Sequence, residues 1–595
     1  MFEWAASETE RPWKRWALLG FALFVIIALV MKWNAIQGLG LSDTDDNLRL
    51  AQVRDWLAGQ GWYDLRQYRM ESPEGANIHW SRIPDLPIAG LILLLTPLLG
   101  AGVAEKIAVT IAPLIPAVVL IFAVATVTRR LVAKGAWPIA LLAVLMASSV
   151  SAQLMPLRID HHGWQLAMLA LVMAGFTDPK PARGGTIMGL AIACSLAIGL
   201  EMIIFIALMG AASVIGWIFF IGERQRLIAL GAATAGGCAL FYLLFGSDVN
   251  RQMVCDALSP VWLSDALVGG ALLVAIAWKA PRDWRWRLGL AAGAGLVIAA
   301  FHALAFPDCL TRLEGVSDDA YRLWLSRVTE AQPITDQSPK MMLTALFLPV
   351  VALAGYFLLL KRGGVERQRM ALGMGAAMLV AVALMFWQTR LASAAQLLAI
   401  PGAAGLLVVL LPKLEQSTSP LVRVVGISFA FIAATGALPI LISDYLPKGE
   451  REKEGAKNEL AGLTRQQCGT EEAMAPLAAL PAGHVYTFID MAPRVLVMTH
   501  HSTVTGPYHR NHQAIVDNIQ TLRAPAEEAR TRLAAWGADY LLICKGQAGP
   551  MGKGKDKQGI AWQLIQGAEY DWLEPVETGP KNPNLVFRIV PGSSG

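Results

Sequence analysis

Charged side chains are scarce in this sequence. Asp, Glu, Lys and Arg together make up 16% of the 595 residues, whereas hydrophobic residues make up 55% and the mean hydropathy is +0.47. Since one membrane span needs about 20 predominantly apolar residues, this composition excludes an ordinary soluble protein and predicts a polytopic α-helical membrane protein. The net charge of +5 is small for this length and gives no reason to expect a nucleic-acid partner.

Internal repeats are also lacking, and ionisable residues are nearly absent from the middle of the apolar runs. Transporters commonly have inverted repeats and place ionisable residues or broken helices near the bilayer midplane. Glu201, between two predicted spans, comes closest to such a residue, and a short outer turn is its ordinary explanation. The sequence therefore makes a transporter the alternative and not the first hypothesis.

The basic residues predict how the spans are oriented. Cytoplasmic loops are enriched in Lys and Arg, and Trp13-Lys14-Arg15 precedes the first apolar run. Six later basic loops all fall on the cytoplasmic side if Leu86–Leu99 does not cross the membrane by itself. We therefore expect this run to be an interfacial helix or the first part of one long tilted span. The N-terminus is then cytoplasmic, and about thirteen spans lie near residues 16–34, 104–128, 135–153, 164–177, 185–199, 202–221, 227–245, 263–279, 286–306, 340–360, 370–388, 392–411 and 421–445.

The chain becomes polar from about Lys448 onward, which predicts two domains, 1–446 in the membrane and 447–595 outside the cytoplasm. Short apolar runs bounded by turn residues predict strands, and amphipathic stretches predict helices. The second domain is therefore expected to be an α/β domain of normal size. Its expected strands are His484–Asp490, Arg494–Met498, Asp539–Cys544 and Leu585–Val590, and its expected helices are Gln513–Leu522 and Pro525–Trp536.

Six cysteines are present. Cys194 and Cys238 lie inside apolar runs, where inert packing is expected. The other four fall in segments predicted to lie outside the cytoplasm, where disulfides persist in an oxidising periplasm. Their locations allow the pairs Cys255–Cys309 and Cys468–Cys544.

Three acidic clusters lie in polar segments between apolar runs, at Ser42–Asp46, Arg158–His162 and Arg327–Pro333. The span count places all three on the non-cytoplasmic side. Carboxylates near a membrane are costly unless they are paired or bind a metal ion, and oxygen ligands suit Mg²⁺ or Mn²⁺. Each cluster alone has an ordinary explanation, such as helix capping. A convergent set predicts a divalent cation site.

The clusters, in this order, resemble the catalytic subunit family of oligosaccharyltransferases, which are membrane glycosyltransferases of the GT-C class. The first outer loop of that family carries an acidic-x-Asp motif and then an Arg, a Pro-x-Gly and a Trp. The matching residues are Asp43-Thr44-Asp45, Arg49, Pro73-Glu74-Gly75 and Trp80, with Asp85 following.

Later segments continue the resemblance. Asp160-His161-His162 is similar to the second-loop motif of archaeal members, and Val328–Pro333 is similar to a Ser-Val-Ser-Glu-His-Gln-Pro segment of eukaryotic members. Arg390-Leu391 matches an Arg-Leu that faces the donor phosphate in the family. The likeness covers most of residues 16–445 and implies a GT-C fold with a C-terminal extracytoplasmic domain.

The resemblance also implies a site. Asp45, Asp160, His162 and Glu330 are expected to bind a divalent cation, Mg²⁺ or Mn²⁺, which offsets negative charge on a leaving phosphate. Glu330, Asp45 or Asp43 is expected to act in catalysis by accepting a proton from an acceptor hydroxyl. Arg390 and Trp80 are expected to bind substrate. The resemblance further implies that the donor is a polyprenyl-phosphate or polyprenyl-diphosphate sugar and that transfer inverts the anomeric centre.

One departure concerns the acceptor. The Trp-Trp-Asp signature, which reads the Ser or Thr of the acceptor sequon in the family, is absent from 446–595. The segment His500–Asn511 contains many His, Tyr and Arg residues and is expected to cover the active site, with His509 and Arg510 contacting phosphate or acceptor because Arg binds phosphate bidentately. A strand-to-helix loop with a Pro turn is its ordinary explanation.

The first hypothesis is therefore a metal-dependent glycosyltransferase of the bacterial inner membrane. It acts on the periplasmic side and has a lipid, polysaccharide or protein acceptor. The alternatives are a flippase or transporter of lipid-linked sugars, a true protein oligosaccharyltransferase, and an assembly protein whose acidic loops bind a partner. The ordered motifs favour the first hypothesis.

Overall fold

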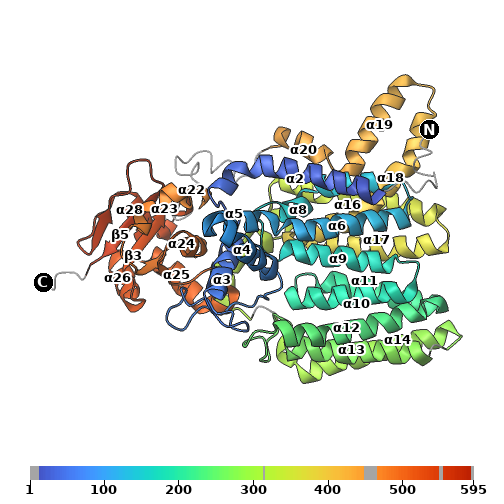
Figure 1. Cartoon of the computed structure of the whole chain (residues 1–595), viewed down its shortest axis with the longest axis horizontal. Coiled ribbons are helices and arrows are strands. Elements are labelled where there is room, and N and C mark those ends of the chain that lie inside the picture. The colour runs from blue at the N-terminus through green and yellow to red at the C-terminus, as the bar shows by residue number, and fades with distance from the viewer. Residues whose placement is uncertain (1–12, 280, 312–314, 448–464, 549–553, 591–595) are drawn as a thin grey trace.

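The computed structural model describes residues 13–279, 281–311, 315–447, 465–548 and 554–590. A long bundle of helices carries a smaller domain at one end, and the C-terminal residues form that domain (Figure 1). We call this end of the bundle the outer end. The helical bundle and the small C-terminal sheet confirm the predicted fold class. The predicted boundary after residue 446 adjoins residues outside the described ranges and stays a prediction.

Within the described ranges, nine helices are long and apolar enough to cross a membrane. The chain is thus a multi-pass membrane protein. These helices are α2 (Trp13–Gln37), α5 (Ala101–Ile111) continued by α6 (Leu114–Leu131), α10 (Pro181–Ile198), α12 (Arg224–Phe245), α13 (Pro260–Lys279), α14 (Trp284–Ala305), α16 (Pro339–Arg362), α17 (Val365–Met385) and α18 (Ala392–Glu415).

The other four predicted spans coincide with helices that are short or bent. Three are 15 to 17 residues long, and the fourth, α7, is bent by 74° from the helix that follows it. The count of thirteen spans therefore stays a prediction. These helices are α7 (Trp137–Met146) with α8 (Ser148–Ser151), α9 (His162–Phe176), α11 (Ile203–Phe219) and α19 (Pro420–Thr435), which α20 (Leu438–Ile442) follows.

Helix α18 lies at the centre of the bundle and α14 at its edge. Most of the apolar stretch of α18 is buried, whereas none of that of α14 is. Small residues allow the central helices to approach closely, since a Cβ atom on Gly355 of α16 would lie 1.8 Å from the carbonyl oxygen of Gly402 in α18. The apolar side chains exposed on α14, such as Leu296 and Leu304, suit contact with lipid.

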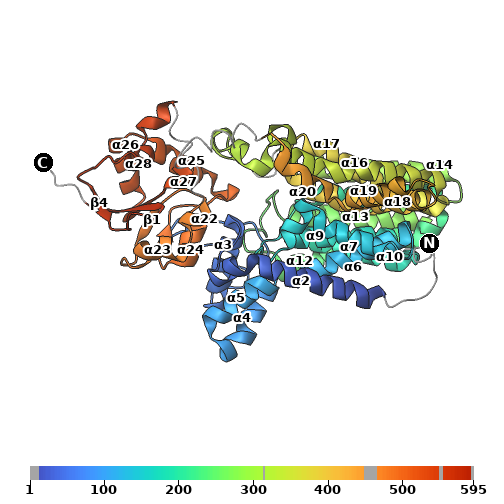
Figure 2. The same cartoon turned by 90° about the horizontal axis from the view of Figure 1, so that it is seen from above.

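The segment predicted to be interfacial forms a helical hairpin beside the bundle. Helix α4 (Asp85–Leu99) turns at Gly100, whose φ of +79° favours glycine, and packs against α5 (Figure 2). Its outward side chains Leu93, Leu94 and Leu98 are 63 to 77% exposed. Because the chain reverses at Gly100, α4 is not the first part of one long span. The structure favours the interfacial alternative.

The basic loops meet at the end of the bundle opposite the C-terminal domain. Arg130 and Arg183 pair with Asp178, and Arg226 donates to the Asp178 carbonyl oxygen at 2.6 Å. Arg369 pairs with Glu223 at 3.2 Å. The charge pattern that predicted one common side for these loops therefore agrees with their packing.

The C-terminal domain contains a five-stranded sheet in the order β2-β1-β3-β5-β4. Strand β1 is parallel to β2 and β3, while β5 is antiparallel to β3 and β4. Helices lie on both faces of the sheet (Figure 2). Its elements are α22 (Arg465–Cys468), α23 (Glu471–Ala478), β1 (His484–Tyr486), α24 (Ala492–Met498), β2 (Ser502–Thr503), α25 (His512–Arg523), α26 (Ala526–Ala535), β3 (Tyr540–Cys544), α27 (Lys545–Ala548), α28 (Ile560–Ile565), β4 (Leu573–Val576) and β5 (Asn584–Ile589).

Three of the four expected strands and both expected helices are present in this domain. The strand expected at Arg494–Met498 is wrong, because this segment is helix α24. Its apolar side chains are buried on more than one side, in the domain core and against the first outer loop. A short run that is buried all round does not distinguish strand from helix by periodicity. Both expected disulfides, Cys255–Cys309 and Cys468–Cys544, are present.

Candidate functional site

The first and second acidic clusters meet at the outer end of the bundle. Asp43 caps helix α3 (Thr44–Leu57), where its side chain accepts from the Thr44 amide at 2.7 Å. Arg158 bridges the two clusters, because its guanidinium lies 2.9 Å from Asp43, 3.3 Å from Asp46 and 2.8 Å from Asp160. The Asp160 amide in turn donates to Asp46 Oδ1 at 3.0 Å. One arginine thus holds three carboxylates together.

Asp160 and His162 face each other within the second cluster. His162 Nδ1 lies 3.0 Å from Asp160 Oδ2, and the His162 amide donates to Asp160 Oδ1 at 3.0 Å. Burial acts to raise the pKa of Asp160, but the positive charges of Arg158 and His162 outweigh it and hold this pKa well below its usual range. Asp160 therefore stays ionised at neutral pH.

Asp45 has too little positive charge around it. Burial of its carboxyl, together with the negative charges of Asp43 and Asp160, raises its pKa to about 8, and Glu330 acts in the same direction. Burial likewise raises the pKa of Asp46 to about 7, although Arg158 opposes this shift. A bound divalent cation would supply the missing charge and reverse this shift. The excess of carboxylates fits a cation.

We call the segment between α14 and α16, which contains the third acidic cluster, the fifth outer loop. It reaches the same place through its hydrogen bonds to the turn before α18. The Gln332 carbonyl oxygen accepts from the Thr389 amide at 2.8 Å and from the Thr389 hydroxyl at 2.7 Å. This contact places Glu330 and Arg390 on neighbouring turns. Glu330 is exposed, and its negative charge raises the pKa of Asp45. Arg390 Nε is buried without a hydrogen-bond partner.

Trp80 packs among three segments. It is 2% exposed, Arg49 stacks over its ring at 4.7 Å, and its ring centre lies 5.8 Å from that of His161 and 5.6 Å from that of Tyr508. Arg49 also pairs with Asp85 in a fully buried contact. The Arg, Trp and Asp of the first outer loop that match the family motif thus form a packed cluster in contact with His161 of the second cluster. Substrate binding by Trp80 stays a prediction.

The C-terminal domain is joined to the first outer loop. Arg69 donates to the carbonyl oxygens of Leu496, Thr499 and His501 at 2.7 to 3.0 Å. The Arg69 carbonyl oxygen accepts from the Thr503 amide at 2.7 Å, and Met70 forms a parallel bridge with Thr503. The loop thereby lies alongside the edge strand of the domain sheet.

The segment His500–Asn511 lies over the first acidic cluster. The Tyr508 hydroxyl donates to the Thr44 carbonyl oxygen at 3.2 Å, and Asn511 exchanges hydrogen bonds with the backbone of Asn77. Because Thr44 lies between Asp43 and Asp45, this hydrogen bond brings the segment to the first cluster, and the covering of an active site stays a prediction. His509 and Arg510 are both engaged by Asp256, at 2.6 and 2.7 Å. Their predicted contact with phosphate or acceptor stays a prediction.

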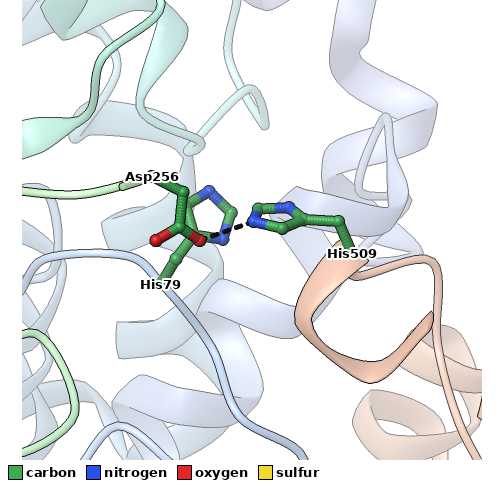
Figure 3. Close-up of side chains that lie close together, drawn as sticks. All are labelled: His79, Asp256 and His509. Carbon is green, nitrogen blue, oxygen red and sulfur yellow. Dashed lines mark hydrogen bonds and ion pairs between the residues drawn. The ribbon is translucent and has the colours of Figure 1, made fainter. Parts of the chain in front are cut away.

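Among the described residues, one group of His and Asp side chains has all its ligand atoms within 4.8 Å of one another, and it is not the predicted set. This group is His79, Asp256 and His509 (Figure 3). These three residues share no sequence motif and lie far apart along the chain, so sequence analysis could not connect them. The predicted ligands Asp45, Asp160, His162 and Glu330 interact electrostatically but are more widely spaced.

Glu201 supports the second cluster and is not a midplane charge. Its carboxylate lies 2.8 Å from His161 Nε2 and accepts from Gln165 at 2.9 Å. Burial opposes ionisation, but His161 holds the pKa of Glu201 well below its usual range. Sequence reasoning missed several residues that hydrogen-bond to the predicted residues, and Gln165 and Asp256 are two of them. They occur in no motif of their own.

A cavity of about 580 Å³ opens beside the first cluster, between the end of α2 and the C-terminal domain. Asp43 and Thr44 lie on one wall, and Glu471 and Arg494 lie on the other. The walls carry charges of both signs. A polar molecule in this cavity would lie against the carboxylate of Asp43.

No protein-family model matches the sequence, and no curated protein matches it. Solved structures of the archaeal oligosaccharyltransferase AglB from Archaeoglobus fulgidus are similar in fold. A complex with an inhibitory peptide and a dolichol-phosphate gives a TM-score of 0.67 at 14% identity, over 94% of this chain and 79% of that chain. A form tethered to an acceptor peptide with the NVT sequon gives 0.63 at 14% identity, over 97% and 75%.

A third structure of the same enzyme, in complex with Zn and sulfate, gives a TM-score of 0.61 at 14% identity, over 96% of this chain and 73% of that chain. Identity this low establishes the fold and not the activity. The alignments extend over the bundle and the C-terminal domain together. The resemblance to GT-C oligosaccharyltransferases drawn from the motifs is thus confirmed for the fold.

Proposed function

We propose that this protein is a metal-dependent GT-C glycosyltransferase. It moves a sugar or glycan from a polyprenyl-phosphate or polyprenyl-diphosphate donor to an acceptor on the periplasmic face of the bacterial inner membrane. In this orientation the N-terminus is cytoplasmic and the C-terminal domain is periplasmic. The observation that carries the proposal is the convergence of Asp45, Asp160, His162 and Glu330, from three outer loops, at one end of the membrane bundle.

The donor set fits a hard divalent cation. Three carboxylates and one imidazole suit Mn²⁺ or Mg²⁺, and a bound cation would oppose the rise in the pKa of Asp45 that burial and the neighbouring carboxylates cause. Asp45, Asp160, His162 and Glu330 are the residues that would hold the ion. When bound, it offsets the negative charge that develops on the leaving phosphate.

The remaining steps belong to the protein's own residues. Arg158 keeps Asp43, Asp46 and Asp160 together in the absence of substrate. Arg390 stands on the turn next to Glu330, where its guanidinium suits a bidentate contact with the donor phosphate. Asp43 or Glu330 accepts the acceptor's proton. The segment His500–Asn511 keeps water from the reacting atoms.

The missing Trp-Trp-Asp signature favours an acceptor that is not a sequon peptide. The mixed charge of the cavity beside Asp43 fits a polar acceptor, such as the sugar end of a lipid or polysaccharide. A flippase is less well supported, because Glu201 is paired with His161 in an outer turn and offers no charge at the midplane.

The proposal is tested by mass spectrometry of the cell envelope from a strain that lacks this protein. A glycan missing from lipid, polysaccharide or protein identifies both sugar and acceptor, and the wild-type chain should restore it while Asp45→Ala and Asp160→Ala should not. In a purified assay with the donor so identified, a chelator should stop transfer and Mn²⁺ or Mg²⁺ should restore it. Lipid-linked donor that accumulates on the cytoplasmic face of the membrane, and not on the periplasmic face, contradicts the proposal and favours a flippase.

A further inference from the structure

Three side chains from three separate outer segments meet beside the site. His79 belongs to the first outer loop, Asp256 to the loop between α12 and α13, and His509 to the C-terminal domain (Figure 3). His509 Nε2 lies 2.6 Å from Asp256 Oδ2, and the ring centres of the two histidines are 4.4 Å apart. We call these three residues the triad.

We propose that the triad binds a divalent transition-metal ion of the zinc type, at a site separate from the cation site above. Two imidazole nitrogens and one carboxylate oxygen form a typical zinc donor set, with the fourth position open to water. His79 Nδ1 is buried without a hydrogen-bond partner, which a buried polar atom rarely is. His79 therefore has a nitrogen that no other contact uses.

The distances allow an ion after a small movement. Zinc–nitrogen and zinc–oxygen bonds of about 2.1 Å in a tetrahedron place two ligand atoms about 3.4 Å apart. His509 Nε2 and Asp256 Oδ2 are closer than this, because a hydrogen bond joins them without the ion. The ion has room once the proton of this hydrogen bond is lost and the two side chains separate by less than 1 Å.

Neighbouring side chains hold the carboxylate in place. Arg510 donates to Asp256 Oδ2 from Nε at 2.8 Å and to Oδ1 from Nη2 at 2.7 Å. Asn250 and Asn77 accept from the same guanidinium at 2.7 and 3.2 Å. Hydrogen bonds of this kind fix the orientation of metal-binding carboxylates. Arg510 also brings a positive charge, which weakens binding compared with a site without it.

An ion in the triad would cross-link the outer face of the molecule. Asp256 follows Cys255, whose disulfide to Cys309 anchors its loop to the segment after α14. His509 follows Tyr508, which lies over the first acidic cluster. The ion would therefore fasten the covering segment His500–Asn511 to two outer loops at once. Its role is to hold the C-terminal domain against these two loops.

The test counts zinc bound to the purified full-length protein in detergent. Asp160→Asn first removes the other cation site, so that only the triad is counted. After metal removal by a chelator, Zn²⁺ titration followed by elemental mass spectrometry should give one equivalent per chain in the Asp160→Asn background. Adding His79→Ala or His509→Ala should weaken binding at least tenfold, while His500→Ala, an exposed histidine of the same domain, should not change it.

A spectroscopic measurement covers the case in which a variant does not fold. Co²⁺ added to the Asp160→Asn protein should give the visible absorption bands of a four-coordinate nitrogen and oxygen site, and Zn²⁺ should abolish them. The proposal is overturned if this protein binds no zinc equivalent, if folded His509→Ala binds zinc equally well, or if no Co²⁺ bands appear. Failure of glycosyl transfer in the Asp160→Asn protein affects only the proposed function, since the zinc count does not depend on it.

Discussion

Arg158 is the residue on which the carboxylate cluster depends. Its side chain is 13% exposed and pairs with Asp43, Asp46 and Asp160. Removing one partner of a buried ion pair typically costs about 3–5 kcal/mol, because the other charge remains buried and unpaired. The three carboxylates would then repel one another unless a cation replaced the guanidinium.

We predict that Arg158→Ala lowers the free energy of unfolding by about 3 kcal/mol in the absence of divalent cations. The matched control is Arg183→Ala, whose side chain is 51% exposed in its pair with Asp178, and which should destabilise the protein much less because solvent screens this pair. Denaturant unfolding of both purified variants measures the difference. Equal losses would contradict the role given to Arg158.

Glu71 makes stability depend on pH at the contact between the first outer loop and the C-terminal domain. Its carboxylate accepts from the Thr505 hydroxyl at 2.9 Å, and burial raises its pKa from 4.5 to about 7. The folded state thus binds this proton more tightly than the unfolded state. The resulting stabilisation is complete below about pH 4.5 and is lost as the pH rises through 7.

The melting temperature of the wild-type protein should therefore fall between pH 5 and pH 8 as Glu71 ionises. Glu71→Gln should make this fall smaller. The measurement is the difference between wild type and variant across that range, since histidines titrate in both proteins. A difference that does not change with pH would show that Glu71 is ionised in both states.

At the scale of elements, the bundle depends on the close approach of α16 and α18. A Cβ atom on Gly355 would lie 1.8 Å from the Gly402 carbonyl oxygen, so the two helices must separate. Gly355→Ala should lower the free energy of unfolding by about 1–3 kcal/mol. Gly289→Ala in α14, where nothing lies within 4 Å, should be neutral or slightly stabilising. Thermal unfolding in detergent compares the two, and equal melting temperatures would contradict this packing.

The tie between the fifth outer loop and α18 should matter for function more than for folding. Thr389→Val removes the hydroxyl that donates to the Gln332 carbonyl oxygen at 2.7 Å, which costs about 1 kcal/mol. We expect the variant to remain folded but to need more donor, because Glu330 and Arg390 lose their fixed spacing. Arg390→Gln should raise the donor KM further. Donor dependence unchanged in both variants would remove Arg390 from the site.

Much of this architecture could be predicted from the sequence, and the limits have physical causes. Long apolar runs predicted the membrane helices, and short apolar runs bounded by turn residues predicted strands β3 and β5. Helix α24 was misassigned because it is short and buried on several sides. The contacts of Asp256 with His509 and Arg510 could not be predicted, since local patterns carry no information about pairs some 250 residues apart.

At the scale of the whole molecule, hydrogen bonds from Arg69 join the C-terminal domain to the first outer loop. Arg69→Ala removes three hydrogen bonds to backbone carbonyl groups of the domain. Hydrogen exchange should then rise in both β2 and the loop around Met70, whereas Arg66→Ala, whose hydrogen bonds stay within the loop, should affect only the loop. Unchanged exchange in β2 would mean that other contacts hold the domain.

The proposed function requires that outer loops far apart in the sequence share one cation. The most direct measurement is Mn²⁺ binding by electron paramagnetic resonance, made in a His509→Ala background so that the triad is not counted. We expect one tightly bound Mn²⁺ in the parent protein, and the loss of this ion in each of Asp45→Asn, Asp160→Asn and Glu330→Gln. Three folded variants that bind Mn²⁺ as tightly as the parent protein would contradict this expectation.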